Sequence, residues 1–166
     1  MDNTALFNLS YGVYVVTTWG NGKATGCTAN SAMQITASPA TIAISINHDN
    51  YTNKCIKDTG IFAVNILGEN VDPIIIGSFG FRSGKDVDKF EGIEPLVKEF
   101  TPILPQAISY ITCKVINTME TDTHTIFLGQ VTDAGNLSKD APMTYSYYHK
   151  VVKGSTPKNA PTYKGD

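Results

Sequence analysis

The abundance of β-branched residues constrains the fold of this chain more than any other feature. Ile, Val and Thr together account for 46 of the 166 residues, whereas Leu occurs only 7 times. β-branched side chains lose rotamer freedom in a helix and pack well on a pleated sheet, while Leu favours helices. The composition therefore predicts a mainly β protein.

Length and charge exclude several classes of protein. A chain of 166 residues suits one domain with a single core. Its 13 basic and 15 acidic side chains give a net charge of -2, so no basic surplus could neutralise a nucleic-acid backbone. The longest apolar runs are too short to span a membrane, and the first residues do not form a secretory signal. We expect a cytoplasmic protein that binds neither nucleic acid nor membrane.

Established chemical motifs are missing from the sequence. The three cysteines, Cys27, Cys55 and Cys113, form no C-x-x-C pair, which argues against a metal site or a disulfide framework and favours buried free thiols. G-x-G-x-x-G, the P-loop, G-x-S-x-G and H-E-x-x-H are also absent. A dedicated nucleotide-binding fold or a metal enzyme is therefore not expected.

Alternating hydrophobicity and turn residues predict the order of the elements. Strands are expected at 11–19, 23–29, 40–47, 61–67, 106–118 and 125–134, and Gly20-Asn21-Gly22 closes the first hairpin. Short helices are expected from Asn53 to Thr59, capped by Thr52, and over 70–80, capped by Asp72. Six strands with two short helices favour a closed or partly open antiparallel barrel.

Three segments could bind a ligand. Gly26 to Ser31 places small, hydrogen-bonding residues at a strand end, where a flat ligand could approach the backbone, although it could equally be a polar turn. Thr52, Asn53 and Lys54 open a helix whose N–H groups favour a phosphate, although they could form an ordinary N-cap. Arg82 to Lys85 brings two cations into a long polar loop, 81–92, and could be a solvated charge cluster.

Four stretches, in the same order along the chain, resemble the flavin reductase-like family of FMN-binding split barrels. They are Gly12 to Thr18 (GVYVVTT), Thr28 to Ala40 (TANSAMQITASPA), Asp88-Lys89-Phe90 and His124 to Val131 (HTIFLGQV). The aromatic run Tyr147-Tyr148-His149 and the tail after it are most similar to flavoredoxin-type proteins and to the flavin domain of high-molecular-weight rubredoxins.

The resemblance implies a six-stranded antiparallel FMN-binding split barrel with short helices over residues 1–152, followed by a C-terminal arm or linker at 153–166. It also implies a homodimer with one FMN per subunit near the interface. The implied FMN-binding residues are Thr28, Ala29, Asn30 and Ser31 along the ring edge or ribityl chain, Ser45 and Asn47 beside the ring, and Thr52, Asn53 and Lys54 at the phosphate, helped by Arg82, Ser83 or Lys85.

The resemblance also assigns a role to His124, which would approach the cofactor or the incoming nicotinamide as the candidate catalytic residue. The sequence departs from the family pattern here, because Thr123 precedes this histidine where the family commonly has Asp. Asn30 and Gln34 likewise replace hydroxyl residues. A surface histidine at the end of a hairpin is the alternative interpretation.

Two functions follow from the resemblance. The first is an FMN oxidoreductase that takes hydride from NADH or NADPH and passes electrons to free flavin, rubredoxin or another small redox protein. The second is a non-enzymatic FMN-binding relay, reduced only by a protein partner. FMN is preferred over FAD because the sequence has no adenosine-binding fingerprint. The C-x-x-C pairs of a rubredoxin module do not occur in these 166 residues.

Overall fold

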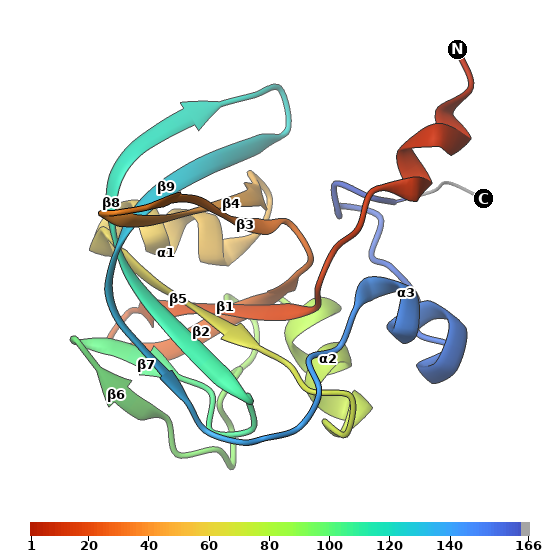
Figure 1. The fold of residues 1–166 in the computed structure, drawn as a ribbon. Helices are drawn as coiled ribbons and strands as arrows, with labels where there is room; N and C mark the ends of the chain where they lie inside the picture. The colour runs from red at the N-terminus through yellow and green to blue at the C-terminus, as the bar shows by residue number, and fades with distance from the viewer. Residues whose placement is uncertain (164–166) are drawn as a thin grey trace.

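The structure of the protein is a computed structural model in which residues 1–163 are described, so the end of the expected arm, 164–166, lies outside the described residues. Seven antiparallel strands form one strongly curved sheet in the order β2-β1-β5-β8-β9-β4-β3 (Figure 1). The strands are β1 (Tyr14–Gly20), β2 (Lys23–Ala29), β3 (Ala32–Ala37), β4 (Ala40–Asn47), β5 (Ile61–Ile66), β8 (Ser109–Glu120) and β9 (His124–Asn136). A separate two-stranded sheet pairs β6 (Leu96–Lys98) with β7 (Thr101–Ile103).

The sheet confirms the mainly β prediction and corrects the strand count. Seven strands are present in the main sheet instead of six, because Ala32–Ala37 pairs with β4 as an additional strand, β3. The sheet is not closed: β2 and β3 are its two edges. These two strands follow each other in the chain, so the short link of Asn30 and Ser31 lies where the barrel is split.

The first hairpin forms as its turn residues predict. Asn21 and Gly22 both adopt positive φ, 51° and 75°, which is the conformation of a tight two-residue hairpin turn. β2 and β4 have the predicted bounds. β1 begins three residues later than expected, at Tyr14.

The two helices expected from the sequence are short, and asparagine and aspartate cap them. α1 (Tyr51–Thr59) has Asn50 as its N-cap, with the Thr52 N–H donating to Asn50 Oδ1 at 3.1 Å, so the prediction that Thr52 is the cap is wrong. Gly60 ends α1 in the left-handed conformation. α2 (Pro73–Gly80) has Asp72 as its cap, as predicted. The remaining helical segments, η1 (Asn3–Asn8), α3 (Tyr145–Tyr147) and the π-helical η2 (Tyr148–Val152), were not expected from the sequence.

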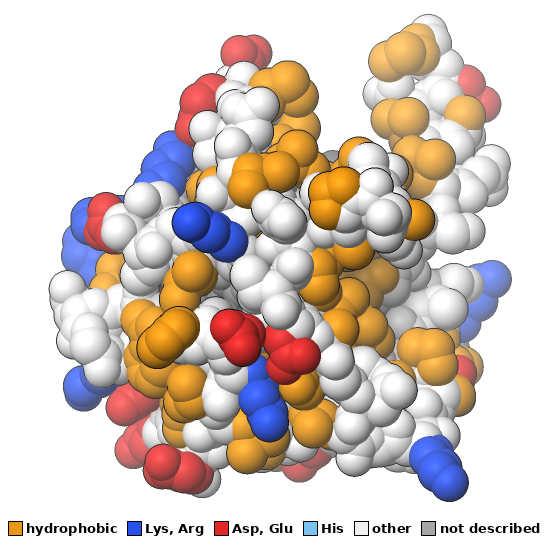
Figure 2. All heavy atoms as spheres, turned by 60° about the vertical axis from the view of Figure 1, so that its left-hand side comes forward, with side chains coloured by type: hydrophobic (Ala, Val, Ile, Leu, Met, Phe, Trp, Pro, Cys, Tyr) orange, Lys and Arg blue, Asp and Glu red, His pale blue; other side chains and the backbone are white. Residues whose placement is uncertain are grey.

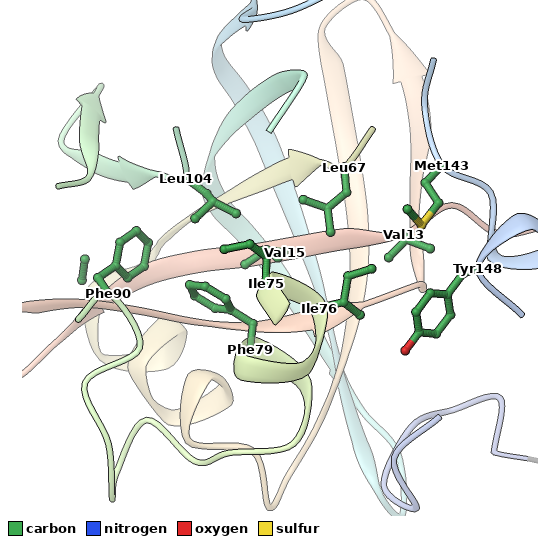
Figure 3. Packing of buried hydrophobic residues seen from close by; sticks show 11 residues of the cluster. Val13, Val15, Leu67, Ile75, Ile76, Phe79, Phe90, Leu104, Met143 and Tyr148 are labelled. Carbon is green, nitrogen blue, oxygen red and sulfur yellow. The ribbon is translucent and has the colours of Figure 1, made fainter. Parts of the chain in front are cut away.

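Two buried clusters hold these elements together. One lies inside the curve of the sheet and includes Phe62, Phe127 and Ile56 of α1. The other joins the outer face of β1 to α2, to Phe90 and to the C-terminal segment, whose Met143 and Tyr148 point into it (Figure 3). The start of the C-terminal segment is therefore part of the core.

The Asp88-Lys89-Phe90 stretch fixes the long loop after α2. Lys89 is buried, and its Nζ donates to the carbonyls of Ser78 and Phe79 at 3.0 and 2.9 Å, which satisfies the C-terminal end of α2. Phe90 packs edge-on against Phe79 with the ring centroids 5.4 Å apart. Both contacts return the loop to α2 and so hold Arg82 and Ser83 in place.

All three cysteines are buried free thiols, as predicted. Across residues 1–163, no helix has the length and apolarity needed to cross a membrane.

Candidate functional site

A groove runs from the ends of β2 and β4 towards the N-terminus of α1. At its inner end is a cavity of about 70 Å³, which we call the inner cavity. A second cavity of about 490 Å³, the outer cavity, adjoins it, and the two share Asn50, Gly80 and Phe81. The predicted residues that line the inner cavity are Thr28, Ala29, Asn30, Ser45 and Asn47.

The split in the sheet positions the inner cavity. The Ser45 N–H of β4 donates to the Ser31 carbonyl at 3.1 Å, which holds the link between the sheet edges beside β4. Ser31 itself does not line the inner cavity, because its hydroxyl turns to Asn30 Oδ1 at 3.0 Å. Thr28 Oγ1 donates to the Ile76 carbonyl of α2 at 2.9 Å, so α2 forms one wall of the groove.

The start of α1 places its side chains differently from the sequence-based expectation. Thr52 is buried. Asn53 is also buried, and its Nδ2 donates to the Ile46 carbonyl and to Thr125 Oγ1, both at 2.9 Å. Lys54 points to solvent and pairs with Asp58 one turn along the helix. None of the three lines either cavity; Asn50 and Tyr51, just before them, line the outer cavity.

The loop after α2 brings only part of its predicted cluster to the groove. Arg82 and Ser83 line the outer cavity, where both side chains are exposed. Lys85 lies in a different depression, beside the β1–β2 turn, with Lys23 and Tyr51. The structure therefore gathers one of the two loop cations, together with the N-terminus of α1, at the outer end of the groove.

His124 is the first residue of β9 and pairs in register with Asn47 of β4. Its Nδ1 hydrogen-bonds Thr123 Oγ1 at 2.7 Å, so the threonine hydroxyl orients the ring where the family commonly has Asp. Its Nε2 is buried and has no hydrogen-bond partner among the described residues. Burial, aided by nearby His48, lowers the pKa of His124 below its ordinary value of 6.5, although the Asn159 carbonyl opposes this shift. Burial therefore favours the neutral form of the ring.

The C-terminal segment supplies groove residues that the sequence analysis did not assign to the site. Tyr145 lines the inner cavity, and its ring packs edge-on against His149 with centroids 4.3 Å apart. Residues of the expected arm also line this cavity: Ser155, Thr156, Pro157, Asn159, Ala160 and Pro161. The aromatic run before the arm is the sequence signal that could have identified this wall.

The fold and the groove define the class of protein. Amide and hydroxyl side chains line a narrow inner cavity beside apolar walls, and an arginine and a helix N-terminus lie at the outer end. The chemistry of these lining groups suits a flat ring joined to a phosphate-bearing chain. A flavin mononucleotide has this chemistry.

Comparisons with known proteins identify the family. Residues 6–155 match the flavin reductase like domain. The high molecular weight rubredoxin of Moorella thermoacetica is 41% identical over 165 residues, which cover 98% of this chain and 72% of that protein. The ferric-chelate reductase (NAD(P)H) of Archaeoglobus fulgidus is 38% identical over 165 residues, covering 98% of both chains. The crystal structure of flavoredoxin from Methanosarcina acetivorans superposes with a TM-score of 0.72 at 25% identity, over 76% of this chain and 69% of that one.

The chain belongs to the flavin reductase-like family, as the sequence motifs predicted. It is accordingly an oxidoreductase of the flavoprotein class.

Proposed function

We propose that the protein is an FMN-dependent reductase that takes hydride from NADH or NADPH and passes electrons to free flavin or to a small redox protein such as rubredoxin. The observation that carries the proposal is the groove, which joins Thr28, Asn30 and Asn47 at one end to Arg82 at the other. The names of two relatives, a ferric-chelate reductase (NAD(P)H) and a high molecular weight rubredoxin, support the donor and the acceptor.

In this proposal the inner cavity holds the flavin ring. Thr28, Ala29 and Ser45 border the ring, and the side-chain amides of Asn30 and Asn47 hydrogen-bond its polar edge or the ribityl hydroxyls. The flavin supplies the redox chemistry, because its ring accepts a hydride and can release electrons singly or in pairs. The protein binds and orients the two reactants and excludes water from the space between them.

His124 is proposed to orient the nicotinamide. Its Nδ1 is held by Thr123, and burial favours the neutral form of the ring. His124 itself lines neither cavity, but its register partner Asn47 lines the inner one, which would bring Nε2 near a nicotinamide bound there. That nitrogen can hydrogen-bond a carboxamide without adding a positive charge beside the hydride donor.

The outer cavity is proposed to hold the phosphate. Arg82 offers the bidentate donors that suit a phosphate, Ser83 adds a hydroxyl, and the N-terminus of α1 contributes its positive dipole end. The sequence has no adenosine-binding fingerprint, so we assign FMN and not FAD. Mass spectrometry of the released cofactor tests this assignment, and a dominant FAD peak would overturn it.

Arg82 and Lys85 provide a matched test of the phosphate site. Arg82→Ala should weaken FMN binding at least tenfold, about 1.4 kcal/mol, because the charge-assisted bonds to phosphate are lost. Lys85→Ala, which removes a cation of the same loop outside the groove, should change the dissociation constant less than threefold. Equal effects of the two substitutions in a fluorescence titration would mean that the phosphate binds elsewhere.

The relay remains the second candidate function. In its favour is the similarity to a rubredoxin-named relative over nearly the whole chain. A relay needs only the close approach of a reduced partner, whereas a reductase also needs space for a nicotinamide over the flavin. Reduction of the bound flavin by NADH distinguishes the two functions.

A further inference from the structure

The C-terminal arm, which we define as residues 153–163, crosses the groove. Its residues Thr156, Pro157 and Asn159 line both the inner and the outer cavity. In Figure 1 the chain turns back after α3 and η2 and runs beside this side of the sheet as an irregular segment. The arm therefore covers the groove along its length.

Two hydrogen bonds join the arm to the residues that we place at the flavin. Asn30 Nδ2 donates to Thr162 Oγ1 at 2.7 Å, and Asn47 Nδ2 donates to the Asn159 carbonyl at 3.0 Å. A hydroxyl and a carbonyl oxygen are also the groups that a flavin offers, in its ribityl chain and on its ring. The arm thus gives the side-chain amides of Asn30 and Asn47 the same kinds of hydrogen-bond acceptor that a bound flavin would give them.

The base of the arm is anchored in the core. Tyr148 lies in the buried cluster between β1, α2 and the C-terminal segment (Figure 3). Its hydroxyl donates to the Ser155 carbonyl at 3.1 Å. Lys153 adopts a left-handed conformation with φ 57°, and a Cβ on Gly154 would lie 1.9 Å from the Tyr148 ring. Position 154 therefore requires glycine, because any side chain there would clash with the Tyr148 ring.

Beyond this base, side-chain hydrogen bonds hold the arm. The Thr156 hydroxyl contacts the Tyr145 hydroxyl and lies 3.2 Å from His149 Nε2, and Thr162 Oγ1 donates to the Tyr145 hydroxyl at 3.2 Å. No residue from Ser155 to Tyr163 is fully buried. Because little apolar surface is buried here, displacing this part of the arm costs little compared with unfolding an element of the core.

With the arm in place, the inner cavity is too small for the flavin ring that we assign to it. The inner cavity measures about 70 Å³, whereas small-molecule sites usually enclose roughly 300–1,000 Å³. His124 Nε2 is also buried, and the Asn159 carbonyl lies close enough to affect its pKa. The groove can admit the ring and expose this histidine only if the arm moves.

We propose that the arm is an intramolecular competitor of the flavin: it occupies the groove through Asn30 and Asn47 and must leave these contacts before FMN can bind. This inference rests on the proposed function. The apparent affinity for FMN is then reduced by the fraction of molecules with the arm closed, and weakening the arm raises that affinity.

The test compares FMN binding by the full-length protein and by two matched variants. Thr156→Val/Thr162→Val removes the hydroxyls that hold the arm and leaves every proposed flavin residue in place. Thr118→Val makes the same exchange at an exposed position of β8, away from the groove lining. The association rate and the dissociation constant are measured by stopped-flow quenching of FMN fluorescence, and thermal melts verify that all three proteins are folded.

We expect the double variant to bind FMN at least threefold faster and at least threefold more tightly than the parent, and Thr118→Val to match the parent. If the parent binds FMN and the double variant binds it equally well or more weakly, the inference is overturned while the proposed function stands. If no form binds FMN, the proposed function fails, and the inference fails with it.

Discussion

At the scale of single residues, four asparagine side chains near the groove have different structural roles. Asn30 and Asn47 line the inner cavity, Asn50 caps α1, and Asn53 is buried beneath the strands. Successive helical residues point about 100° apart. The same helix start therefore directs Asn53 inwards and Lys54 to solvent, which a linear motif does not reveal.

Asn53→Ala should destabilise the fold instead of abolishing flavin binding. The substitution leaves the Ile46 carbonyl and the Thr125 hydroxyl without their buried donor, at a cost of about 1–3 kcal/mol in the free energy of unfolding. Lys54→Ala, which removes only an exposed ion pair, should cost less than about 1 kcal/mol. Urea denaturation measures both, and an Asn53→Ala protein of normal stability with weakened FMN binding would restore the phosphate role.

His124→Ala should slow the reduction of bound flavin by NADH at least threefold and leave FMN affinity nearly unchanged, because the side chain is proposed to orient the nicotinamide. His48→Ala is the control, since that histidine hydrogen-bonds Glu120 at 2.8 Å on the surface. Stopped-flow reduction gives the rate per bound flavin. If neither the rate nor the affinity changes by more than threefold, His124 has no role in the reaction.

The candidate site was predictable where a residue's position follows from the end of a strand. Thr28, Ser45 and Asn47 reach the inner cavity because β2 and β4 end there. The contacts of Tyr145 and the arm with the groove are long-range, so the aromatic run before the arm was the only local sequence signal for this wall.

At the scale of the elements, Gly129 of β9 explains one position of the His124 to Val131 motif. A Cβ there would lie 2.6 Å from Cys113 Cβ and 2.7 Å from the Phe62 ring, inside the curve of the sheet. Gly129→Ala should therefore lower the free energy of unfolding by about 1–3 kcal/mol through overpacking. Gly77→Ala, in α2 with open space around it, should raise it by up to about 1 kcal/mol. Thermal melts that move in the same direction for both would contradict this.

Glu120 links α1 to the β8–β9 hairpin and should make stability depend on pH. Hydrogen bonds from Lys57 and Thr125, together with His48, lower the pKa of Glu120 from 4.5 to about 2. The folded state therefore favours the carboxylate, and this contribution is full above pH 4.5 and disappears as the pH falls towards 2.

The difference in urea midpoint between the parent and Glu120→Gln should accordingly be larger at pH 7 than at pH 3. A difference of the same size at both pH values would show that the carboxylate charge does not stabilise the fold.

Whether a strand could be predicted from the sequence depended on how much of it is buried. β2 and β4 were predicted with their bounds because turn residues flank both strands and their middle residues are mostly buried. β3 was missed because five of its six residues are exposed, so its sequence shows no alternation between a buried and a solvent face.

At the scale of the whole molecule, we propose a homodimer. The edge strand β3 exposes Met33 and Ile35 by 64% and 47%, which is an association surface on an unpaired sheet edge. Figure 2 shows hydrophobic side chains among the charged ones on one face of the molecule. Leu6 and Leu9 of the N-terminal segment are also exposed.

Light scattering should give about twice 17.9 kDa for the parent. Met33→Lys/Ile35→Lys should shift the mass towards that of one chain, because it places charge on the proposed interface. Ile74→Lys, at an equally exposed isoleucine on α2, should not. A parent protein that is monomeric and still binds FMN would remove the dimer from the account.

A reductase of the proposed kind uses a nicotinamide to reduce its own bound flavin. The most direct measurement is an anaerobic titration of the FMN-loaded protein with NADH and, separately, with NADPH, followed by the visible absorbance of the flavin. We predict that at least one of the two bleaches the flavin completely at one equivalent per bound FMN, since one hydride carries the two electrons that the ring accepts. A flavin that stays oxidised with both nucleotides, yet is bleached by a reduced rubredoxin, would contradict the reductase and identify the protein as a relay.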